Sequence, residues 1–183
     1  MVGETDYPCW TSERPGVGRS YVQLDDRPVD DLGYQAWIRG VKEGRLYCGD
    51  GRSHFLEFEV NGHSSGGDDV QLVTHDTILI KALVAARLEP DLSLESQTSK
   101  RTPPYGWDLE WARIGTTRNV TVELVVDGIA VDEASLIADG APRSIEFRRL
   151  IDRSAWVALR ILPSPYSPGI CTSQRQLYTG LKI

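Results

Sequence analysis

Apolar side chains recur at helical spacing in one part of the chain. Four of them fall at positions i, i+3, i+4 and i+7, which lie on one side of a helix. They are Tyr34, Trp37, Ile38 and Val41. Asp31 can cap the first turn, and Gly44 follows the last periodic residue as a stop. The pattern predicts one amphipathic helix over residues 31–43, preceded by loop and a short edge strand near residues 21–24.

After residue 45 the apolar positions alternate, which is typical of strands with one buried face. The alternating runs lie at residues 55–60, 78–84, 120–126, 129–131, 144–147 and 155–162. The turn dipeptides Asn61-Gly62, Asp127-Gly128 and Asp139-Gly140 separate several of these runs. The sequence therefore predicts a mainly β fold, an immunoglobulin-like antiparallel β-sandwich with one N-terminal amphipathic helix and no helix after residue 45.

Two of these runs also predict which side chains face the core. In residues 55–60 the alternation places Leu56, Phe58 and Val60 on one side of the strand. Residues 78–84 carry apolar side chains on both sides, so we expect this strand to be central in its sheet.

The length and the pattern together suggest how the chain is organised. A chain of 183 residues corresponds to about one domain at roughly 150 residues each. We expect a helical N-terminal part over residues 1–45, the β-sandwich over residues 46–164, and an irregular tail over residues 165–183, where the alternation stops. Residues 88–105 predict a long loop, which is either a binding element or a connector.

Charge and composition exclude some partners. The chain has 20 Lys and Arg against 26 Asp and Glu, a net charge of −6, so it lacks the positive field that attracts nucleic acid or an anionic membrane. No apolar run reaches about 18 residues, and the first residues show no signal-peptide pattern. We expect neither a nucleic-acid nor a membrane partner, and no compartment is indicated.

Aromatic and acidic side chains alternate just after the predicted loop. Trp107 and Trp111 lie on one side of this run, and Asp108 and Glu110 on the other. Aromatic faces stack on the C–H groups of sugars while carboxylates bind hydroxyls, so these four residues are candidates for ligand binding. The alternative is that the tryptophans anchor the loop on the core.

An acid, a hydroxyl and an imidazole follow each other closely at Asp50, Ser53 and His54. These groups are used together in nucleophilic catalysis, but neighbouring residues do not reach that geometry without distant partners. The alternative interpretation is a turn that leads into a strand.

Several separated segments, in this order, resemble the C-terminal part of CehA/McbA-like metallohydrolases. They are residues 3–9 (GETDYPC), 16–22 (GVGRSYV), 34–40 (YQAWIRG), 49–54 (GDGRSH), 107–115 (WDLEWARIG) and 156–164 (WVALRILPS). The resemblance implies a fold in which a barrel of the polymerase and histidinol phosphatase (PHP) type is followed by a β-sandwich. The resemblance covers about residues 3–164 and implies that residues 1–45 are the remnant of the end of the barrel.

The resemblance implies a metal site in the intact family but an incomplete one here. Asp6 matches a late carboxylate ligand of the barrel, and Glu4 is a second oxygen ligand beside it. Pro8 stands where such loops commonly have a histidine, and the histidine-rich first motifs have no counterpart. We therefore expect a noncatalytic accessory domain that needs no cofactor, whereas the intact family uses a divalent metal. Its expected partner is the missing barrel, or a second copy bound through the N-terminal helix.

Two other functions stay open from the sequence. The chain could be a free-standing carbohydrate- or ligand-binding module that uses Trp107 and Trp111, or it could retain metal-dependent hydrolysis through Glu4, Asp6 and His54. A shifted reading frame from Pro165 onward is a hypothesis for the irregular tail, and such a tail should pack poorly.

Overall fold

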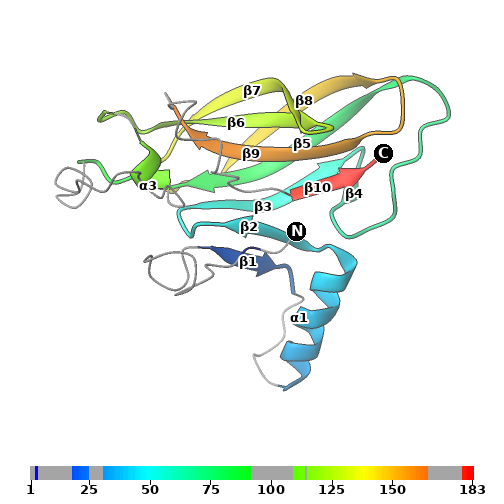
Figure 1. The fold of residues 1–183 in the computed structure, drawn as a ribbon, viewed down its shortest axis with the longest axis horizontal. Helices are drawn as coiled ribbons and strands as arrows, with labels where there is room; N and C mark the ends of the chain where they lie inside the picture. Colours follow the sequence, from blue (N-terminus) through cyan, green and yellow to red (C-terminus); the bar gives the residue numbers. More distant parts are fainter. Residues whose placement is uncertain (1–2, 4–17, 25–30, 92–108, 114, 165–178) are drawn as a thin grey trace.

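The computed structural model describes residues 3, 18–24, 31–91, 109–113, 115–164 and 179–183 (Figure 1). The N-terminal elements are β1 (Arg19–Val22), α1 (Asp31–Glu43) and β2 (Leu46–Gly49). The elements that follow are β3 (Ser53–Val60), β4 (His63–Ser64), β5 (Asp76–Ala86), α3 (Leu109–Ala112), β6 (Asn119–Val126), β7 (Ile129–Ile137), β8 (Arg143–Ile151), β9 (Trp156–Pro163) and β10 (Thr179–Lys182).

The strands form two four-stranded antiparallel sheets and one two-stranded ribbon. One sheet has the order β4-β3-β5-β8 and the other β10-β9-β6-β7, while β1 pairs only with β2. The mainly β fold with antiparallel sheets is confirmed, and α1 occupies the predicted range. The prediction of no helix after residue 45 is wrong, because α3 forms one helical turn at residues 109–112.

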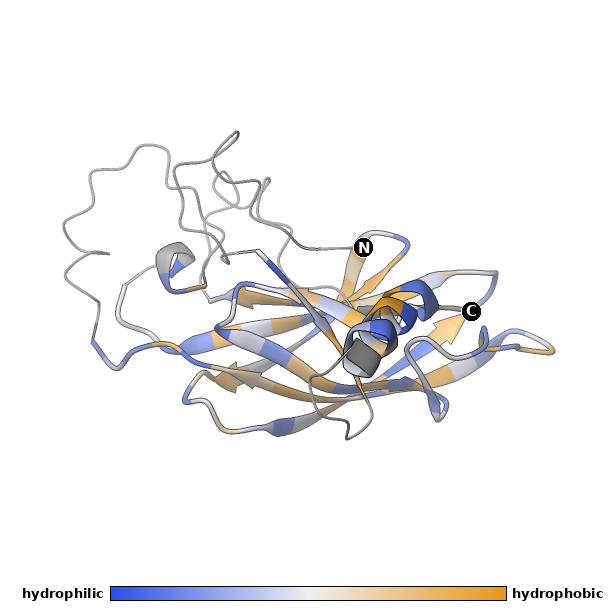
Figure 2. Cartoon of the chain, turned by 90° about the horizontal axis from the view of Figure 1, so that it is seen from below, coloured by the Kyte–Doolittle hydropathy of each residue, from blue (hydrophilic) through white to orange (hydrophobic). Residues whose placement is uncertain are grey.

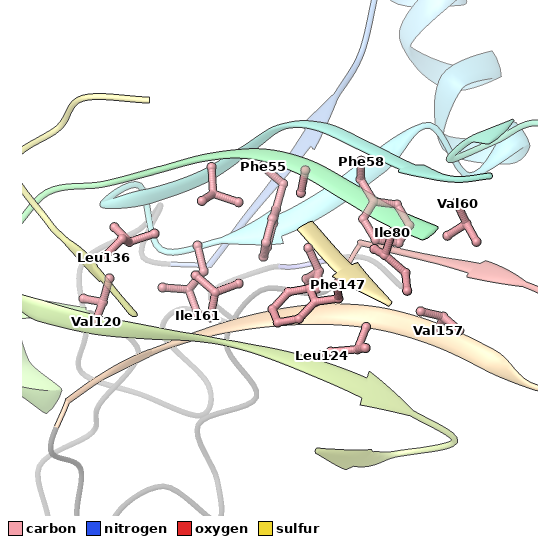
Figure 3. Close-up of a cluster of buried hydrophobic side chains, with 14 of the residues drawn as sticks. Phe55, Phe58, Val60, Ile80, Val120, Leu124, Leu136, Phe147, Val157 and Ile161 are labelled. Atoms are coloured by element: carbon pink, nitrogen blue, oxygen red, sulfur yellow. The ribbon is translucent and has the colours of Figure 1, made fainter. Parts of the chain in front are cut away.

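The two sheets share one apolar core (Figure 3). Strand β5 is central in its sheet, as predicted, and Ile78, Ile80 and Val84 are each 0% exposed. Phe147 of β8 faces the same core and lies opposite Ile80 in the strand register. The other sheet contributes Val120, Val122, Leu124, Val157, Leu159 and Ile161 to this core.

The prediction that Leu56 faces the core with Phe58 and Val60 is wrong. The register between β3 and β5 shifts between Phe55 and Glu57, which is a β-bulge. The extra residue reverses the alternation, so Phe55 is buried and Leu56 is 46% exposed. A bulge of this kind leaves no signature in the apolar alternation itself.

Two of the three predicted turn dipeptides form hairpins, and the third connects the two sheets. Asn61 and Asp127 each have a φ of 49°, and the glycines after them also have positive φ, as tight hairpins require. The Asn61 turn joins β3 to β4, and the Asp127 turn joins β6 to β7. The turn at Asp139-Gly140 instead carries the chain from β7 in one sheet to β8 in the other.

The structure also bears on the predicted boundaries at residues 45 and 164. Strands β1 and β2 pair across the first boundary, so residues 19–22 and 46–49 belong to one ribbon. The expectation of an irregular tail is wrong for its last residues, since β10 pairs with β9 and Ile183 is a buried member of the core. Residues 165–178 lie outside the described residues, so the frameshift hypothesis stays untested.

Candidate functional site

The β1–β2 ribbon contacts β3 through an aromatic cluster made of Tyr21, Tyr47 and His54. The Tyr21 and Tyr47 rings stack with centroids 4.9 Å apart, and Tyr21 meets the His54 imidazole edge-on, also at 4.9 Å. A hydrogen bond of 2.7 Å joins the Tyr47 hydroxyl to His54 Nδ1. Stacked and edge-on rings are favourable arrangements, so the cluster attaches the ribbon to the sheet.

Burial favours the neutral forms of Tyr47 and His54. Desolvation, assisted by repulsion from Tyr21, raises the pKa of the Tyr47 phenol well above its usual range. Desolvation and the positive charge of Arg19 lower the pKa of His54, against the opposing effect of Asp50. Tyr47 and His54 are therefore a neutral hydrogen-bonded pair rather than a tyrosinate beside an imidazolium.

This lowered pKa predicts a loss of stability in mild acid. The unfolded chain takes up a proton on His54 at about pH 6.5, before the folded protein does. The contribution of neutral His54 to the free energy of unfolding is thus fully present above that pH. It declines as the pH falls from there toward the lower pKa that His54 has in the folded protein. Urea unfolding at several pH values should show a steeper decline from about pH 7 to 5 for the wild type than for His54→Gln. Parallel pH dependences for the two proteins would contradict the burial of a neutral His54.

A groove of about 360 Å³ lies beside the aromatic cluster, between the ribbon and β3. Tyr21, Tyr47 and Leu56 contribute apolar walls, and Glu57 and Glu59 contribute carboxylates. The β-bulge between Phe55 and Glu57 turns the Leu56 side chain outward, so the bulge also shapes this groove. The apolar alternation in the sequence did not predict this bulge.

The three groups proposed for catalysis, Asp50, Ser53 and His54, are each engaged in contacts within the protein. Asp50 is 7% exposed, and its carboxylate accepts hydrogen bonds from the backbone N–H groups of Arg52 at 2.8 Å and Leu109 at 2.6 Å. Ser53 is fully buried and its hydroxyl is 3.4 Å from Asp50, while His54 is hydrogen-bonded to Tyr47. The interpretation as a turn that leads into a strand fits these contacts, because each group supports local structure.

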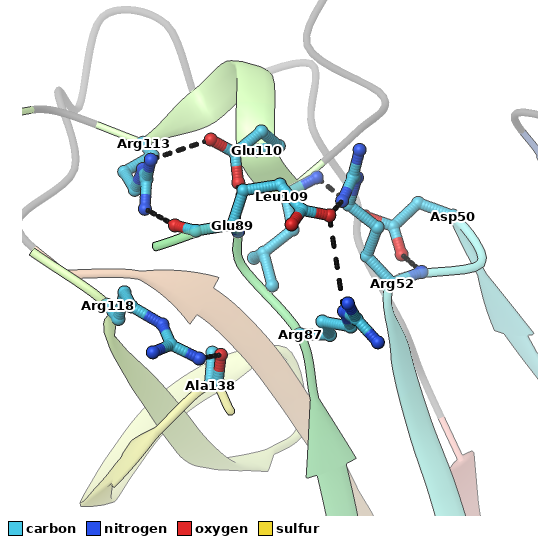
Figure 4. Close-up of polar contacts among 9 residues, drawn as sticks. All are labelled: Asp50, Arg52, Arg87, Glu89, Leu109, Glu110, Arg113, Arg118 and Ala138. Carbon is cyan, nitrogen blue, oxygen red and sulfur yellow. Dashed lines mark hydrogen bonds and ion pairs between the residues drawn. The ribbon is translucent and has the colours of Figure 1, made fainter. Parts of the chain in front are cut away.

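Three buried charged side chains, those of Asp50, Glu110 and Arg113, connect the chain near Glu89 with residues 109–113 (Figure 4). Glu110 Oε1 lies 2.8 Å from Arg113 Nη2, with the two side chains 2% and 1% exposed. The Glu89 backbone N–H donates to Glu110 at 3.0 Å, and Arg113 Nη1 donates to the Glu89 carbonyl at 2.8 Å. Together with the bond from the Leu109 N–H to Asp50, these contacts fix residues 89 and 109–113 against each other. We call Asp50, Glu89, Glu110 and Arg113 the loop clamp.

The residues predicted from the sequence have different outcomes. Glu110 is buried in the loop clamp, so its carboxylate contacts protein groups. Trp107, Asp108, Glu4 and Asp6 lie outside the described residues, as does the side chain of Trp111. Binding of a carbohydrate by the residues around Trp107 therefore stays a prediction, and so does metal binding by Glu4 and Asp6.

Among the described residues, no three His, Cys, Asp or Glu side chains are grouped so that they could hold a metal ion. No helix in this part of the chain has the length and apolar character needed to cross a membrane.

Comparison with known proteins identifies no relative. No family model matches the chain, and no curated protein or solved structure matches it either.

Sequence reasoning missed the aromatic cluster and the loop clamp. The cluster joins residues from three strands, and Tyr21 and His54 are 33 positions apart, too far for any local motif. The loop clamp had one usable signal, the i, i+3 spacing of Glu110 and Arg113, which indicates a helical turn with paired charges.

Proposed function

We propose that the chain is a noncatalytic accessory β-sandwich that docks on a partner domain through one face of α1. The observation that carries this proposal is the exposure of large apolar side chains on that helix. Tyr34 is 61% exposed and Trp37 is 38% exposed, next to the half-buried Ile38 and Val41. We call these four residues the α1 face. Exposed apolar surface of this kind marks interaction sites in soluble proteins.

The attachment of α1 supports a role as a docking element. Figure 1 shows the helix projecting from the ribbon away from the two sheets, and in Figure 2 it carries both apolar and polar residues. Gly40 approaches β1 so closely that a Cβ there would collide with Val22. Backbone bonds from Gln23 to Arg45 and from Arg45 to Gly40 fix the C-terminal end of the helix. The α1 face is thus presented on a firmly attached helix.

The edges formed by β7 and β8 are poorer candidates for docking. Each of these strands ends one of the two four-stranded sheets. The register places Asp132 of β7 opposite Leu124 and Arg149 of β8 opposite Ile78, so each edge strand has a charged residue at an inward position. Charges at inward positions oppose the addition of another strand.

The strand connectivity supports the immunoglobulin-like type of sandwich. Counted from β3, and leaving aside the β1–β2 ribbon and the two-residue β4, the first, second and fifth strands form one sheet, and the third, fourth, sixth and seventh form the other. Immunoglobulin domains also combine the first, second and fifth strands, and the third, sixth and seventh. Here β7, the fourth strand, pairs with β6, as the extra strands of the variable type do.

The noncatalytic part of the proposal is supported by the contacts of the candidate catalytic groups. Asp50 accepts hydrogen bonds from backbone N–H groups, His54 is hydrogen-bonded to Tyr47, and burial lowers the pKa of His54. We propose as partner a PHP-type barrel of the CehA/McbA-like metallohydrolases, in which the divalent metal and its chemistry would reside.

Replacing Trp37 with glutamate is expected to abolish docking without unfolding the domain. Since Trp37 is partly exposed, the free energy of unfolding should change by no more than about 1 kcal/mol, whereas burying a charge at an apolar interface should weaken binding at least thirtyfold or so. Sedimentation with a purified PHP-type barrel measures the binding, and urea unfolding measures the stability.

Gln35→Glu is the matched control, because it adds the same charge at an exposed position of α1 outside the α1 face. This control should bind the barrel like the wild type. Equal binding by Trp37→Glu would contradict the proposal, and a homodimer lost in Trp37→Glu would assign the α1 face to a second copy of the chain instead.

A further inference from the structure

We propose that the groove between the β1–β2 ribbon and β3 binds a small organic cation, an amine carried on an apolar or aromatic body. This site is separate from the α1 face and does not depend on docking. Three features of the groove carry the inference: its size, its aromatic and aliphatic walls, and two carboxylates at its β3 side.

The size and walls of the groove suit an apolar ligand body. Its volume of about 360 Å³ lies within the range of small-molecule sites. Tyr21 and Tyr47 are stacked on each other and half-buried, so the pair forms a wall that is already ordered without a ligand. Leu56 is 46% exposed although it is aliphatic, and a bound apolar group would cover it.

The charges of the groove select a cation over an anion. Glu57 and Glu59 both line it, and neither forms an ion pair within the part of the chain that the structure describes. Arg45 also lines the groove, but Glu43 binds its guanidinium at 2.8 Å and the Gln23 carbonyl accepts another of its N–H groups at 3.1 Å. The negative charge of the two carboxylates is therefore left for a ligand.

Lys81 of β5 is a cation close to these carboxylates. It is exposed and lines a neighbouring hollow together with Glu57 and Glu59. In the strand register it is opposite Glu59. No ion pair joins the two residues among those described. Tyr47 stays a neutral phenol, since burial raises its pKa.

A pair of nearly isosteric probes tests the inference on the full chain. 2-Phenylethylamine carries an ammonium group at neutral pH, and 2-phenylethanol replaces it with a hydroxyl on the same body. Isothermal titration should show saturable binding of the amine, with the alcohol at least about tenfold weaker, because a hydrogen bond to a charged group contributes more than a neutral one. A higher salt concentration should weaken binding of the amine and leave binding of the alcohol unchanged.

Substitutions locate the binding within the groove. The double variant Glu57→Gln and Glu59→Gln should weaken amine binding about tenfold or more. Glu146→Gln is the matched control, since it removes a carboxylate from the outer face of the same sheet but outside the groove, and it should stay within about twofold of the wild type.

Near-ultraviolet circular dichroism of the tyrosines checks that the variants keep the aromatic cluster. Equal affinities for the amine and the alcohol, unchanged binding in the double variant, or no saturable binding of the amine would each overturn the proposal.

Discussion

Replacing Glu110 with glutamine is expected to destabilise the protein by about 3–5 kcal/mol. Glu110 and Arg113 are almost completely buried and lie 2.8 Å apart, while Arg113 Nε has no hydrogen-bond partner among the described residues. Without the carboxylate, the guanidinium keeps its positive charge in a site with little access to water. This loss would be a large fraction of the 5–15 kcal/mol that is typical of a whole domain. Urea unfolding followed by tryptophan fluorescence measures it.

A double substitution separates the charge effect from the packing effect. Glu110→Leu combined with Arg113→Met removes both charges and keeps most of the volume, so it should recover a large part of the lost stability. The single variant is expected to be less stable than the double variant. A Glu110→Gln protein within about 1 kcal/mol of the wild type would show that the loop clamp contributes little to folding.

The second large effect is expected at the centre of the shared core. Phe147→Ala should cost about 3–5 kcal/mol, because Phe147 is 5% exposed and its removal leaves a cavity between the sheets (Figure 3). The matched control is Leu150→Ala on the same strand, where the side chain is 62% exposed. The control should change the free energy of unfolding by no more than about 0.5 kcal/mol.

The midpoints of urea unfolding compare these two variants directly. Similar losses for Phe147→Ala and Leu150→Ala would contradict the assignment of Phe147 to the core and Leu150 to the surface.

The elements that the sequence predicted well depend on short-range periodicity. The α1 boundaries follow from the apolar spacing and from Gly44, whose φ of +79° marks the end of the helix. The central position of β5 follows from apolar residues on both of its sides. The hairpins at Asn61 and Asp127 follow from backbone conformations that few other residues adopt.

The elements that could not be predicted depend on contacts between distant segments. Leu56 points outward because of a bulge, which the apolar pattern does not encode. Trp107 to Trp111 suggested an alternating run, yet residues 109–112 form a helical turn whose Glu110 is held by Arg113 and Glu89. Strand β10 was not predicted, because the apolar alternation stops after residue 164. Its place in the sheet is set by pairing with β9.

Docking through the α1 face is tested most directly by hydroxyl-radical footprinting of the chain with and without a purified PHP-type barrel. Oxidation of Tyr34 and Trp37 should fall severalfold when the barrel is added, while oxidation of the exposed Leu150 should stay unchanged. Absence of binding, or binding that leaves Tyr34 and Trp37 as reactive as in the free chain, would contradict it.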